Sequence, residues 1–356
     1  MLRLSNISLT QFKNYSFSTF NFNERVIGIC GLNGRGKTNL LDAIYYACFT
    51  KSYFTKTDAL NVQFESDGFR LEALFDAQKV VLIHRLTGKK ELLLNDTPYD
   101  KFSKHIGKFP AVMVAPDDIE LITGGSEGRR RFLDTVISQV DEQYLQQLIL
   151  YNKVLQQRNS LLKRFAEQGS TNWPLLEVLD HQLIIPGKYI YQTRTNFMQQ
   201  LMPLANDLYG TIAGKKEAVL LEYESQLHSK SFEELLLQGR EKDLILQRSN
   251  AGTHKDDISF LLNGQVFKNI ASQGQRKSLM FALKLAEFQL IKFYKGFAPL
   301  LLLDDVFEKL DQERMFHLLQ WVCADNDGQV FITDTHKERL EDALNNLGTG
   351  YQVIEL

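Results

Sequence analysis

Hydrophobic and polar residues alternate through much of the first 30 positions, which is typical of half-buried β-strands. The alternation covers residues 2–9 and 17–22, and a mostly apolar segment follows at residues 25–30. A glycine-rich turn comes next, and residues 38–49 then carry apolar side chains at helical spacing. This order predicts a strand, a glycine turn and a helix in direct succession.

In the middle of the chain, the spacing of hydrophobic residues changes from a pattern typical of strands to one typical of helices. Short alternating runs between residues 68 and 95 predict an antiparallel meander, and residues 111–114 read as one further buried strand. From about Glu127 to Leu246, leucines and glutamines recur at three- and four-residue spacing, which predicts a helical insertion. Breaks near Pro186 and Pro203 indicate several short-to-medium helices, with no heptad repeat long enough for an extended coiled coil.

The last third of the chain alternates between helices and apolar strands. It opens with Asn263-Gly264 between two apolar runs, a pair that favours a type I′ hairpin turn. The elements expected after it are a helix at 275–294, a strand at 300–303, a helix at 312–323, a strand at 330–333, another helix and a strand at 351–356. Because helices separate these strands, we expect a parallel sheet, and therefore an α/β fold with an added meander and a helical lobe.

Composition narrows the class of protein. The 356 residues are 44% hydrophobic and 24% charged, which is ordinary for a globular protein, and no run of about 18 apolar residues indicates a membrane span. We therefore expect a cytoplasmic protein. Cys30, Cys48 and Cys323 are odd in number and far apart, so we expect buried thiols and no zinc site. The net charge of −2 offers no general cationic field, so any DNA binding requires a local basic patch.

The most specific local motif is a phosphate-binding loop at residues 31–38, which satisfies the pattern G-x-x-x-x-G-K-[ST] between the predicted strand and helix. Glycines let backbone amides surround a β-phosphate, Lys37 reaches the β- and γ-phosphates, and the Thr38 hydroxyl is suited to Mg²⁺. A chance glycine turn is the simpler explanation, but it does not predict the strand before and the helix after. The candidate nucleotide contacts are Gly31, Asn33, Gly34, Gly36, Lys37, Thr38 and Asn39.

Two adjacent carboxylates follow the apolar strand at residues 300–303. In a parallel sheet the carboxyl ends of the strands border the ligand crevice, so Asp304 and Asp305 emerge near the phosphates. Asp304 is the candidate magnesium ligand, and Asp305 is the candidate base that polarises the attacking water. Two acids after a strand usually have no catalytic meaning, but the phosphate loop reverses that expectation. Asp311 and His336 are further candidates for the same hydrolysis site.

Residues 272–275, Ser-Gln-Gly-Gln, stand directly before the predicted helix 275–294. The simplest interpretation is an N-cap serine with a polar first turn. The alternative is that Ser272, Gly274 and Gln275 form an anion site at a helix N-terminus that contacts the γ-phosphate held by another chain. That alternative predicts an active site divided across a symmetric, ATP-dependent dimer.

Together these motifs resemble the ABC ATPase superfamily. The corresponding parts are a Walker A loop at 31–38, a signature at 272–275, a Walker B strand at 300–304, a D-loop at Asp311 and a switch histidine at His336. Within that superfamily the chain resembles the RecF family of bacterial recombination mediators. The blocks that carry the resemblance are Phe12-Lys13-Asn14-Tyr15, residues 115–120, residues 128–134, Gly252-Thr253-His254-Lys255-Asp256-Asp257 and residues 303–307.

The resemblance implies an ABC-type ATPase head. Lobe I would comprise residues 1–115 with 292–356, and a helical lobe II, residues 116–291, would end in the signature motif. It further implies ATP and Mg²⁺ as cofactors, slow DNA-stimulated ATP hydrolysis and an ATP-dependent homodimer. Its implied role is to bind DNA at single-strand gaps and, with RecR- and RecO-like mediators, to help load recombinase in DNA repair, replication recovery and the SOS response.

Two other functions remain as alternatives. A transporter's nucleotide-binding subunit would usually carry a glutamine at the lobe junction, where residues 114–118 have none, and would need a shorter helical insertion. A defence-type ABC ATPase with a nuclease domain would need more chain after His336 than the 20 residues that follow it. The transporter alternative predicts no binding to duplex DNA that ATP strengthens.

The contacts to DNA and to adenine are less sharply indicated than those to phosphate. Lys13, Asn14 and Tyr15 are candidates for the adenine contact. Candidate DNA contacts are Arg129, Arg130 and Arg131 with the group Lys153, Arg158, Lys163 and Arg164, and weaker ones are Lys51 and Lys56. The competing interpretation is that the three consecutive arginines pair with Asp117, Asp118 or Glu120.

Overall fold

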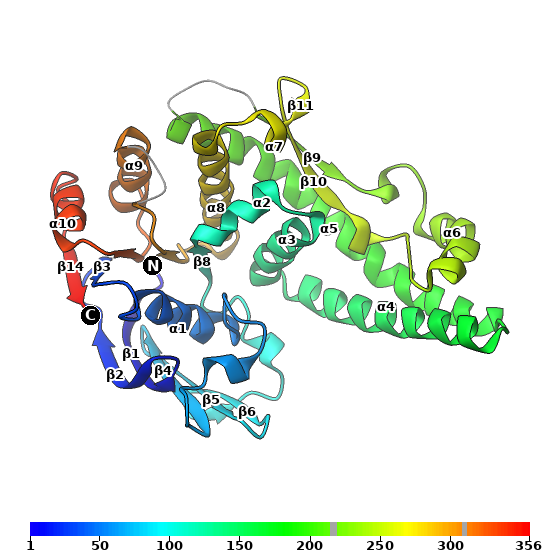
Figure 1. Cartoon of the computed structure of the whole chain (residues 1–356), viewed down its shortest axis with the longest axis horizontal. Coiled ribbons are helices and arrows are strands. Elements are labelled where there is room, and N and C mark those ends of the chain that lie inside the picture. Colours follow the sequence, from blue (N-terminus) through cyan, green and yellow to red (C-terminus); the bar gives the residue numbers. More distant parts are fainter. Residues whose placement is uncertain (214–218, 308–311) are drawn as a thin grey trace. The chain divides into compact units, whose positions relative to one another are not determined.

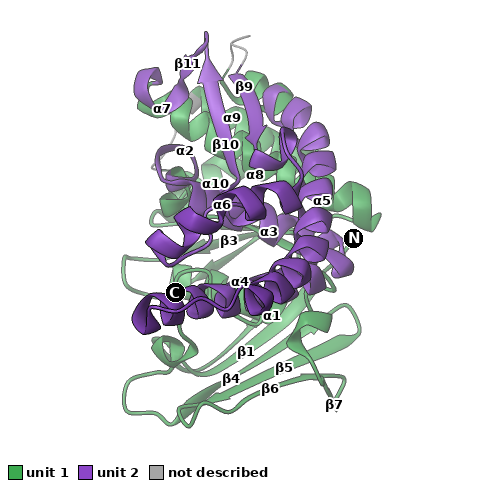
Figure 2. Cartoon of the chain, turned by 90° about the vertical axis from the view of Figure 1, so that its right-hand side faces the viewer, with its two compact units in different colours: residues 1–119, 207–216, 272–356 green, residues 120–206, 217–271 purple. Residues whose placement is uncertain are grey.

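The computed structural model describes residues 1–213, 219–307 and 312–356. The chain forms two compact units: unit 1 holds residues 1–119, 207–216 and 272–356, and unit 2 holds residues 120–206 and 217–271 (Figure 2). The expected lobe II extended to residue 291, whereas helix α8 (Gln273–Lys295) belongs to unit 1. The reason is that α8 is largely buried and contacts strand β8 (Ala111–Val114) of that unit.

A parallel sheet forms the nucleotide-binding part of unit 1, as the alternation of helices and strands predicted. Within the described residues its order is β14-β3-β13-β12-β8. The remaining members are β3 (Val26–Cys30), β12 (Leu300–Leu303), β13 (Val330–Asp334) and β14 (Tyr351–Glu355). All neighbours are parallel, so β3, β12 and β13 end at the same edge of the sheet. Every residue of these three strands is buried, which explains their continuous apolar runs.

An antiparallel sheet completes the strands of unit 1 and confirms the predicted meander. In the described part of the chain its order is β2-β1-β4-β5-β6-β7 (Figure 1). The strands are β1 (Leu4–Phe12), β2 (Tyr15–Asn21), β4 (Gly68–Phe75), β5 (Gln78–Arg85), β6 (Lys90–Leu94) and β7 (Thr97–Pro98). On β1 the alternation seen in the sequence buries Ile7, Leu9 and Phe12 toward the core.

Helix α1 (Lys37–Phe49) contacts strands of both sheets and is buried along almost its whole length. An apolar surface on all sides is what such a central helix requires. Its Tyr46 joins an aromatic cluster with Phe12 and Phe69, whose rings meet edge to face with centroids 5.2–6.1 Å apart. The phosphate loop therefore leads into a helix that is packed in the core of unit 1.

The last elements of unit 1 follow the predicted order. Helix α8 begins at the N-cap Ser272 and stops at Gly296, whose φ of 73° provides a left-handed C-cap. After β12 come α9 (Gln312–Leu319), a π-helical turn (Gln320–Ala324) and α10 (Lys337–Asn345). Short 3-10 turns lie at Asp58–Asn61, Phe102–Lys104 and Pro116–Ile119.

Unit 2 is mainly helical. Its elements are α2 (Glu120–Thr123), α3 (Ser126–Val140), α4 (Glu142–Gln168), α6 (Phe232–Leu246), α7 (Phe267–Ile270) and 3-10 turns at Gln226–His228 and Thr253–Lys255. Helix α5 (Trp173–Ala213) supplies its residues up to 206 to this unit. Within the described residues the sheet order is β11-β10-β9, with β9 (Val219–Glu224), β10 (Asp257–Leu262) and β11 (Gln265–Val266).

The prediction of several short-to-medium helices was wrong for α4 and α5. Helix α5 runs for 41 residues and continues through Pro186 and Pro203. Proline within a helix costs about 3 kcal/mol. Buried side chains at helical spacing outweigh that cost on either side of the prolines, among them Leu183, Ile190, Met198 and Leu201.

The predicted hairpin is confirmed, but one strand of the same sheet was missed. Asn263 and Gly264 have φ values of 52° and 75°, the two left-handed residues of a type I′ turn between β10 and β11. Strand β9 pairs antiparallel with β10 although it lies within the segment predicted to be helical. Val219 and Leu221 of β9 are buried and Leu220 is exposed, a period of two that the surrounding helical pattern masked.

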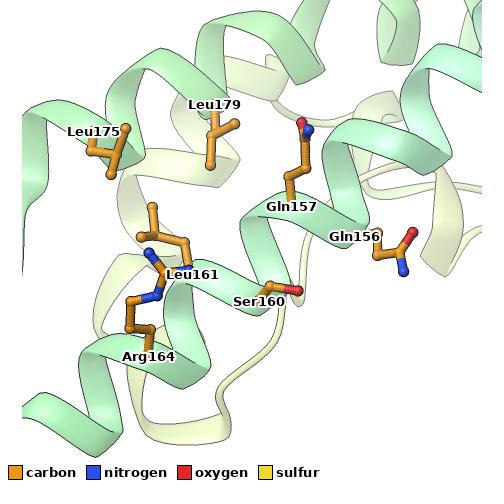
Figure 3. A pocket seen from close by; sticks show the side chains of 7 residues that line it. All are labelled: Gln156, Gln157, Ser160, Leu161, Arg164, Leu175 and Leu179. Atoms are coloured by element: carbon orange, nitrogen blue, oxygen red, sulfur yellow. The ribbon is translucent and has the colours of Figure 1, made fainter.

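A cavity of about 400 Å³ lies between α4 and α5 in unit 2. Figure 3 shows Leu161 of α4 directed toward α5, which contributes Leu175 and Leu179 to the lining. The remaining lining residues are Gln156, Gln157, Ser160 and Arg164. None of these lining residues is acidic, and Arg164, a candidate DNA contact, is the one lining residue that the sequence singled out, so we assign the cavity no chemistry.

Candidate nucleotide site

The phosphate loop joins β3 to α1 at the edge where the parallel strands end. Gly36 is the N-cap of α1, with a φ of 111°. A Cβ atom there would lie 2.6 Å from Asn14 Nδ2 and 2.7 Å from Tyr15 Oη, so both the conformation and the packing require glycine. Lys37 Nζ donates to the carbonyls of Gly31 at 2.7 Å and Leu32 at 3.1 Å, which places the ammonium within the loop.

Asn14, which precedes β2, and Tyr15, the first residue of β2, hold the phosphate loop by hydrogen bonds. Tyr15 Oη donates to the Gly36 carbonyl at 3.0 Å, and Asn14 Nδ2 donates to the Arg35 carbonyl at 3.1 Å. Asn39, a candidate nucleotide contact, donates its side-chain amide to Asn14 Oδ1 at 2.7 Å. Burial raises the pKa of the Tyr15 hydroxyl, so it stays a neutral donor. The candidate adenine contacts Asn14 and Tyr15 therefore act as supports of the loop in this structure.

The third candidate adenine contact, Lys13, forms an ion pair with Asp42 of α1. Its Nζ lies 2.5 Å from Asp42 Oδ2, and the Asp42 side chain is wholly buried. Asp42 also accepts hydrogen bonds from the Ser52 hydroxyl and the Tyr53 amide, both at 2.7 Å. A buried carboxylate needs such partners, because an unpaired charge in the interior is very costly. The pair fixes the turn between β1 and β2 on α1.

The structure brings Thr38 and Asp304 together, as the motifs predicted. Thr38 Oγ1 donates to the Asp304 carboxylate, 3.0 Å from each oxygen. Burial raises the pKa of Asp304, while the hydroxyls of Thr333 and Thr38 lower it by hydrogen bonding to the charged form. A hydroxyl and a carboxylate side by side are the oxygen ligands that Mg²⁺ prefers.

Sequence reasoning missed Thr333, at the end of β13. Its hydroxyl donates to Asp304 Oδ1 at 2.9 Å and accepts from the Asp305 amide at 2.8 Å, and the residue is completely buried. Asp305 has a φ of 50°, a left-handed conformation that is uncommon for a residue with a side chain. One hydroxyl thus fixes both acids after β12. No local signal marks Thr333, because the contact depends on β13 lying beside β12.

His336 follows β13 at the same edge of the sheet. Its backbone amide donates to Asp334 Oδ1 at 2.9 Å, and its Nδ1 lies 2.8 Å from the Thr335 hydroxyl. Asp334 is buried and accepts two bonds from Arg339, at 2.9 and 2.6 Å. The His336 side chain itself is 69% exposed. The other candidate in this group, Asp311, lies outside the described residues.

The signature residues form the N-terminus of α8. Ser272 Oγ accepts from the Gln275 amide at 3.2 Å, and Gln275 Oε1 accepts from the Ser272 amide at 2.8 Å, a complete capping box. Ser272 is exposed. A Cβ atom on Gly274 would lie 2.0 Å from Arg314 Nη1, so this guanidinium packs directly against the helix start. The motif therefore combines a helix N-terminus with a neighbouring cation.

A buried ionic group connects α8 with the turn after β8. Lys284 Nζ lies 3.8 Å from Asp118 Oδ2 and 3.6 Å from Glu287 Oε2. Burial raises the pKa of the Glu287 carboxyl to about 7, although Lys284 lowers it. Next to this part of α8 is a cavity of about 270 Å³, lined by Val114, Ala115, Pro116, Ile119, Lys277, Met280, Phe281, Asp304 and Val306.

Two of the candidate DNA contacts have internal partners. Arg129 donates to both carboxylate oxygens of Asp257, at 2.6 and 2.9 Å, so its partner is not Asp117, Asp118 or Glu120. Arg158 is completely buried and pairs with Asp180 at 2.7 Å and Asp243 at 2.6 Å. Neither guanidinium is available to a DNA backbone.

Comparison with known proteins identifies the family. A DNA replication and repair protein RecF of Flavobacterium johnsoniae is 40% identical over 100% of both chains. The RecF protein of Cytophaga hutchinsonii is 41% identical over 94% of this chain and 90% of its own. The chain belongs to the RecF family. Residues 6–316 also match the family described as AAA domain.

Solved structures agree with the RecF assignment. The recombination mediator protein RecF-ATPrS in the RecFOR pathway has a TM-score of 0.87 and 31% identity, covering 94% of this chain and 93% of that one. RecF-ATP in the same pathway has a TM-score of 0.87 at 30% identity, covering 94% of this chain and 92% of that one. The Smc head domain of Pyrococcus furiosus shares the fold, with a TM-score of 0.55 at 14% identity over 96% of this chain and 92% of its own.

Membership in the RecF family makes this chain an ATPase of the ABC and SMC type that serves DNA replication and repair. The RecF assignment favours the DNA-repair hypothesis over the transporter and defence alternatives. In the described part of the chain, no helix is long and apolar enough to cross a membrane.

Proposed function

We propose that this protein is an ATP-dependent clamp on DNA, in which two copies of the chain hold ATP between them. The observation that carries the proposal is the exposed capping box of Ser272 and Gln275 at the start of α8. Its Ser272 hydroxyl, with the α8 N-terminus and Arg314 beside Gly274, offers an anion site suited to a γ-phosphate. A second copy of the chain, with its own phosphate loop, would supply that phosphate.

Each residue of the candidate site has a role in this proposal. The phosphate loop and Lys37 bind the β- and γ-phosphates, and Gly31, Asn33, Gly34 and Gly36 let the backbone approach them. Thr38 and Asp304 would hold Mg²⁺, which neutralises charge on the phosphates when it is bound. Asp305 accepts the proton of the attacking water, and His336 orients the γ-phosphate. Asp311 completes the interface between the copies.

The biological setting follows from the relatives. RecF in the RecFOR pathway suggests that the clamp acts at gaps between duplex and single-stranded DNA and cooperates with RecR- and RecO-like mediators to load recombinase. ATP favours the closed dimer because the γ-phosphate adds contacts that the open state lacks. Slow hydrolysis, stimulated by DNA, would then release the DNA.

The test is whether ATP strengthens binding to duplex DNA at a stated salt concentration. We expect tighter binding with ATP for the wild type, because closure doubles the surface that meets DNA. Lys37→Ala should bind DNA equally with and without ATP, since it loses the phosphate contact. Asp305→Asn should keep the ATP effect and lose turnover. A wild-type affinity that does not respond to ATP would contradict the clamp.

A further inference from the structure

A group of cations gathers on unit 2 around the turn Thr253–Lys255. Its members, here called the basic cluster, are Arg130, Lys242, Arg248 and Lys255. Lys242, Arg248 and Lys255 are exposed, and Arg130 is partly exposed. They come from α3, α6, the segment after α6 and the turn, so the fold assembles them from positions up to 125 residues apart, the distance from Arg130 to Lys255.

Hydrogen bonds hold three of these segments together. Arg130 Nη1 donates to the Asp256 carbonyl at 2.7 Å, directly beside Lys255. The His254 ring nitrogen Nε2 lies 3.1 Å from the Ser249 carbonyl, directly beside Arg248. Burial lowers the pKa of His254 to about 4, so this ring is neutral at physiological pH and adds no charge. The cluster is therefore placed by the fold rather than by flexible side chains alone.

The nearby carboxylates offset the charge of the cluster only in part, because each has an internal arginine partner. Asp243 pairs with Arg158 at 2.6 Å, and Asp257 pairs with Arg129 at 2.6 Å. Asp256 pairs with Arg194 at 2.9 Å. None of the four cations forms an ion pair within residues 1–213, 219–307 and 312–356.

The pKa of Lys255 shows that the cations of the basic cluster repel one another. Burial lowers the pKa of its ammonium, the charges of Arg248 and Arg130 lower it further, and the charge of Asp243 offsets part of this shift. A group of like charges that is only partly offset by counter-charges destabilises a fold. The C-terminus of α6 accounts for part of the arrangement, since cations there gain about 0.3–1 kcal/mol from the helix dipole. That gain applies to Arg248, which follows the C-cap Gln247, but not to Lys242, which lies before the last turn of α6, or to Lys255 and Arg130.

We propose that the basic cluster binds the phosphate backbone of DNA without sequence preference. Lysine and arginine are the side chains that most often contact backbone phosphates, and such contacts need no base-reading geometry. The proposal rests on the proposed DNA-clamp function and names the surface that serves it. An acidic protein is the competing partner for the same charges, and the experiment below separates the two.

The experiment measures the affinity for a mixed-sequence fluorescent duplex, with ATP, between about 50 and 200 mM salt. The variant is R248Q/K255Q, which removes two exposed charges and leaves Arg130 and its bond to Asp256 in place. The matched control is K101Q/K108Q, which removes two exposed charges from unit 1 at positions that are not candidate DNA contacts. ATP affinity and thermal stability of all three proteins establish that the variants fold and bind nucleotide.

Each phosphate contact adds about 0.9 to the slope of log affinity against log salt. We therefore expect R248Q/K255Q to lower that slope by about 1.8 and the affinity by about tenfold or more near 0.1 M salt. K101Q/K108Q should leave the slope and the affinity close to their wild-type values. An equal loss in the two variants would indicate a general charge effect and overturn the assignment.

The remaining outcomes separate the cluster from the clamp. If the wild type binds DNA in an ATP-dependent manner and R248Q/K255Q behaves identically, the cluster is not the contact surface, and the clamp remains. If the wild type binds no duplex at all, both proposals fail. If R248Q/K255Q keeps DNA binding but loses binding to polyglutamate, the partner is an acidic protein and the DNA assignment is wrong.

Discussion

At the scale of single residues, the candidate site depends on side chains that lie outside the nucleotide-binding motifs and contact their residues. Thr333 joins the two acids after β12. Asn14 and Tyr15 hold the phosphate loop, and the ion pair between Lys13 and Asp42 fixes the turn between β1 and β2 on α1. All of these contacts are short and mostly buried. They fix the orientation of groups that would otherwise depend on flexible loops.

Replacing Thr333 by valine should slow ATP hydrolysis with little change in the fold. Valine has a similar shape, but it removes one hydrogen bond to the Asp304 carboxylate and one from the Asp305 amide. A bond to a charged group contributes about 1.5–3 kcal/mol, which corresponds to roughly tenfold to hundredfold in rate. Steady-state hydrolysis measures the effect. Thr333→Ser keeps the hydroxyl and should recover most of the activity, and an unchanged rate in Thr333→Val would refute the positioning role.

The candidate site could be predicted from sequence where its chemistry is local. The loop from Gly31 to Thr38 and the pair Asp304 and Asp305 are contiguous motifs, and the structure brings Thr38 and Asp304 together as expected. Thr333 escaped prediction, and Tyr15 was expected to contact adenine rather than to support the phosphate loop, because both contacts join segments that are separated in the chain. A lone threonine at the end of an apolar strand gives no sign of its partner.

At the scale of secondary-structure elements, periodicity predicted most strands and the order of the helices, but tertiary packing decided their lengths. Two prolines suggested breaks in α5, yet buried side chains carry the helix through both. Strand β9 stayed hidden because its six residues are too few to stand out from the helical pattern around them. Pairing with β10, which no local pattern reports, is what makes it a strand.

Helix α8 carries a titratable group that should make stability depend on pH. The pKa of Glu287 rises from an ordinary value of 4.5 to about 7, mainly because the carboxyl is buried. Between these values the folded state holds a proton that the unfolded state has released, so this contribution to stability falls as pH rises from about 4.5 to 7. Chemical denaturation at several pH values measures the trend.

Glu287→Gln tests that assignment. A neutral amide of the same shape cannot ionise, so the fall in stability across this pH range should shrink relative to wild type. Glu313→Gln is a suitable control, because Glu313 is an exposed acid on α9. An identical pH profile in Glu287→Gln and wild type would show that the carboxyl does not titrate in this range.

At the scale of the whole molecule, the decisive question is whether the ATPase site is completed by a second copy of the chain. Unit 1 contains the phosphate loop, the acids after β12 and the signature residues. The signature serine is exposed at the start of α8, where a γ-phosphate bound by a partner could meet it. A dimer that forms only with ATP would explain why one chain carries both halves of the site.

Ser272→Arg should prevent this dimer while sparing ATP binding in the monomer, because the long side chain occupies the space where the partner's phosphate would lie. The substitution also removes a helix cap, which costs about 1 kcal/mol by itself. Ser231→Arg is the matched control, since Ser231 caps α6 with the same kind of capping box. Light scattering with ATP should show dimers for wild type and Ser231→Arg and monomers for Ser272→Arg. If Ser272→Arg dimerises normally, the signature residues do not meet the nucleotide of a second copy, and each chain must hydrolyse ATP alone.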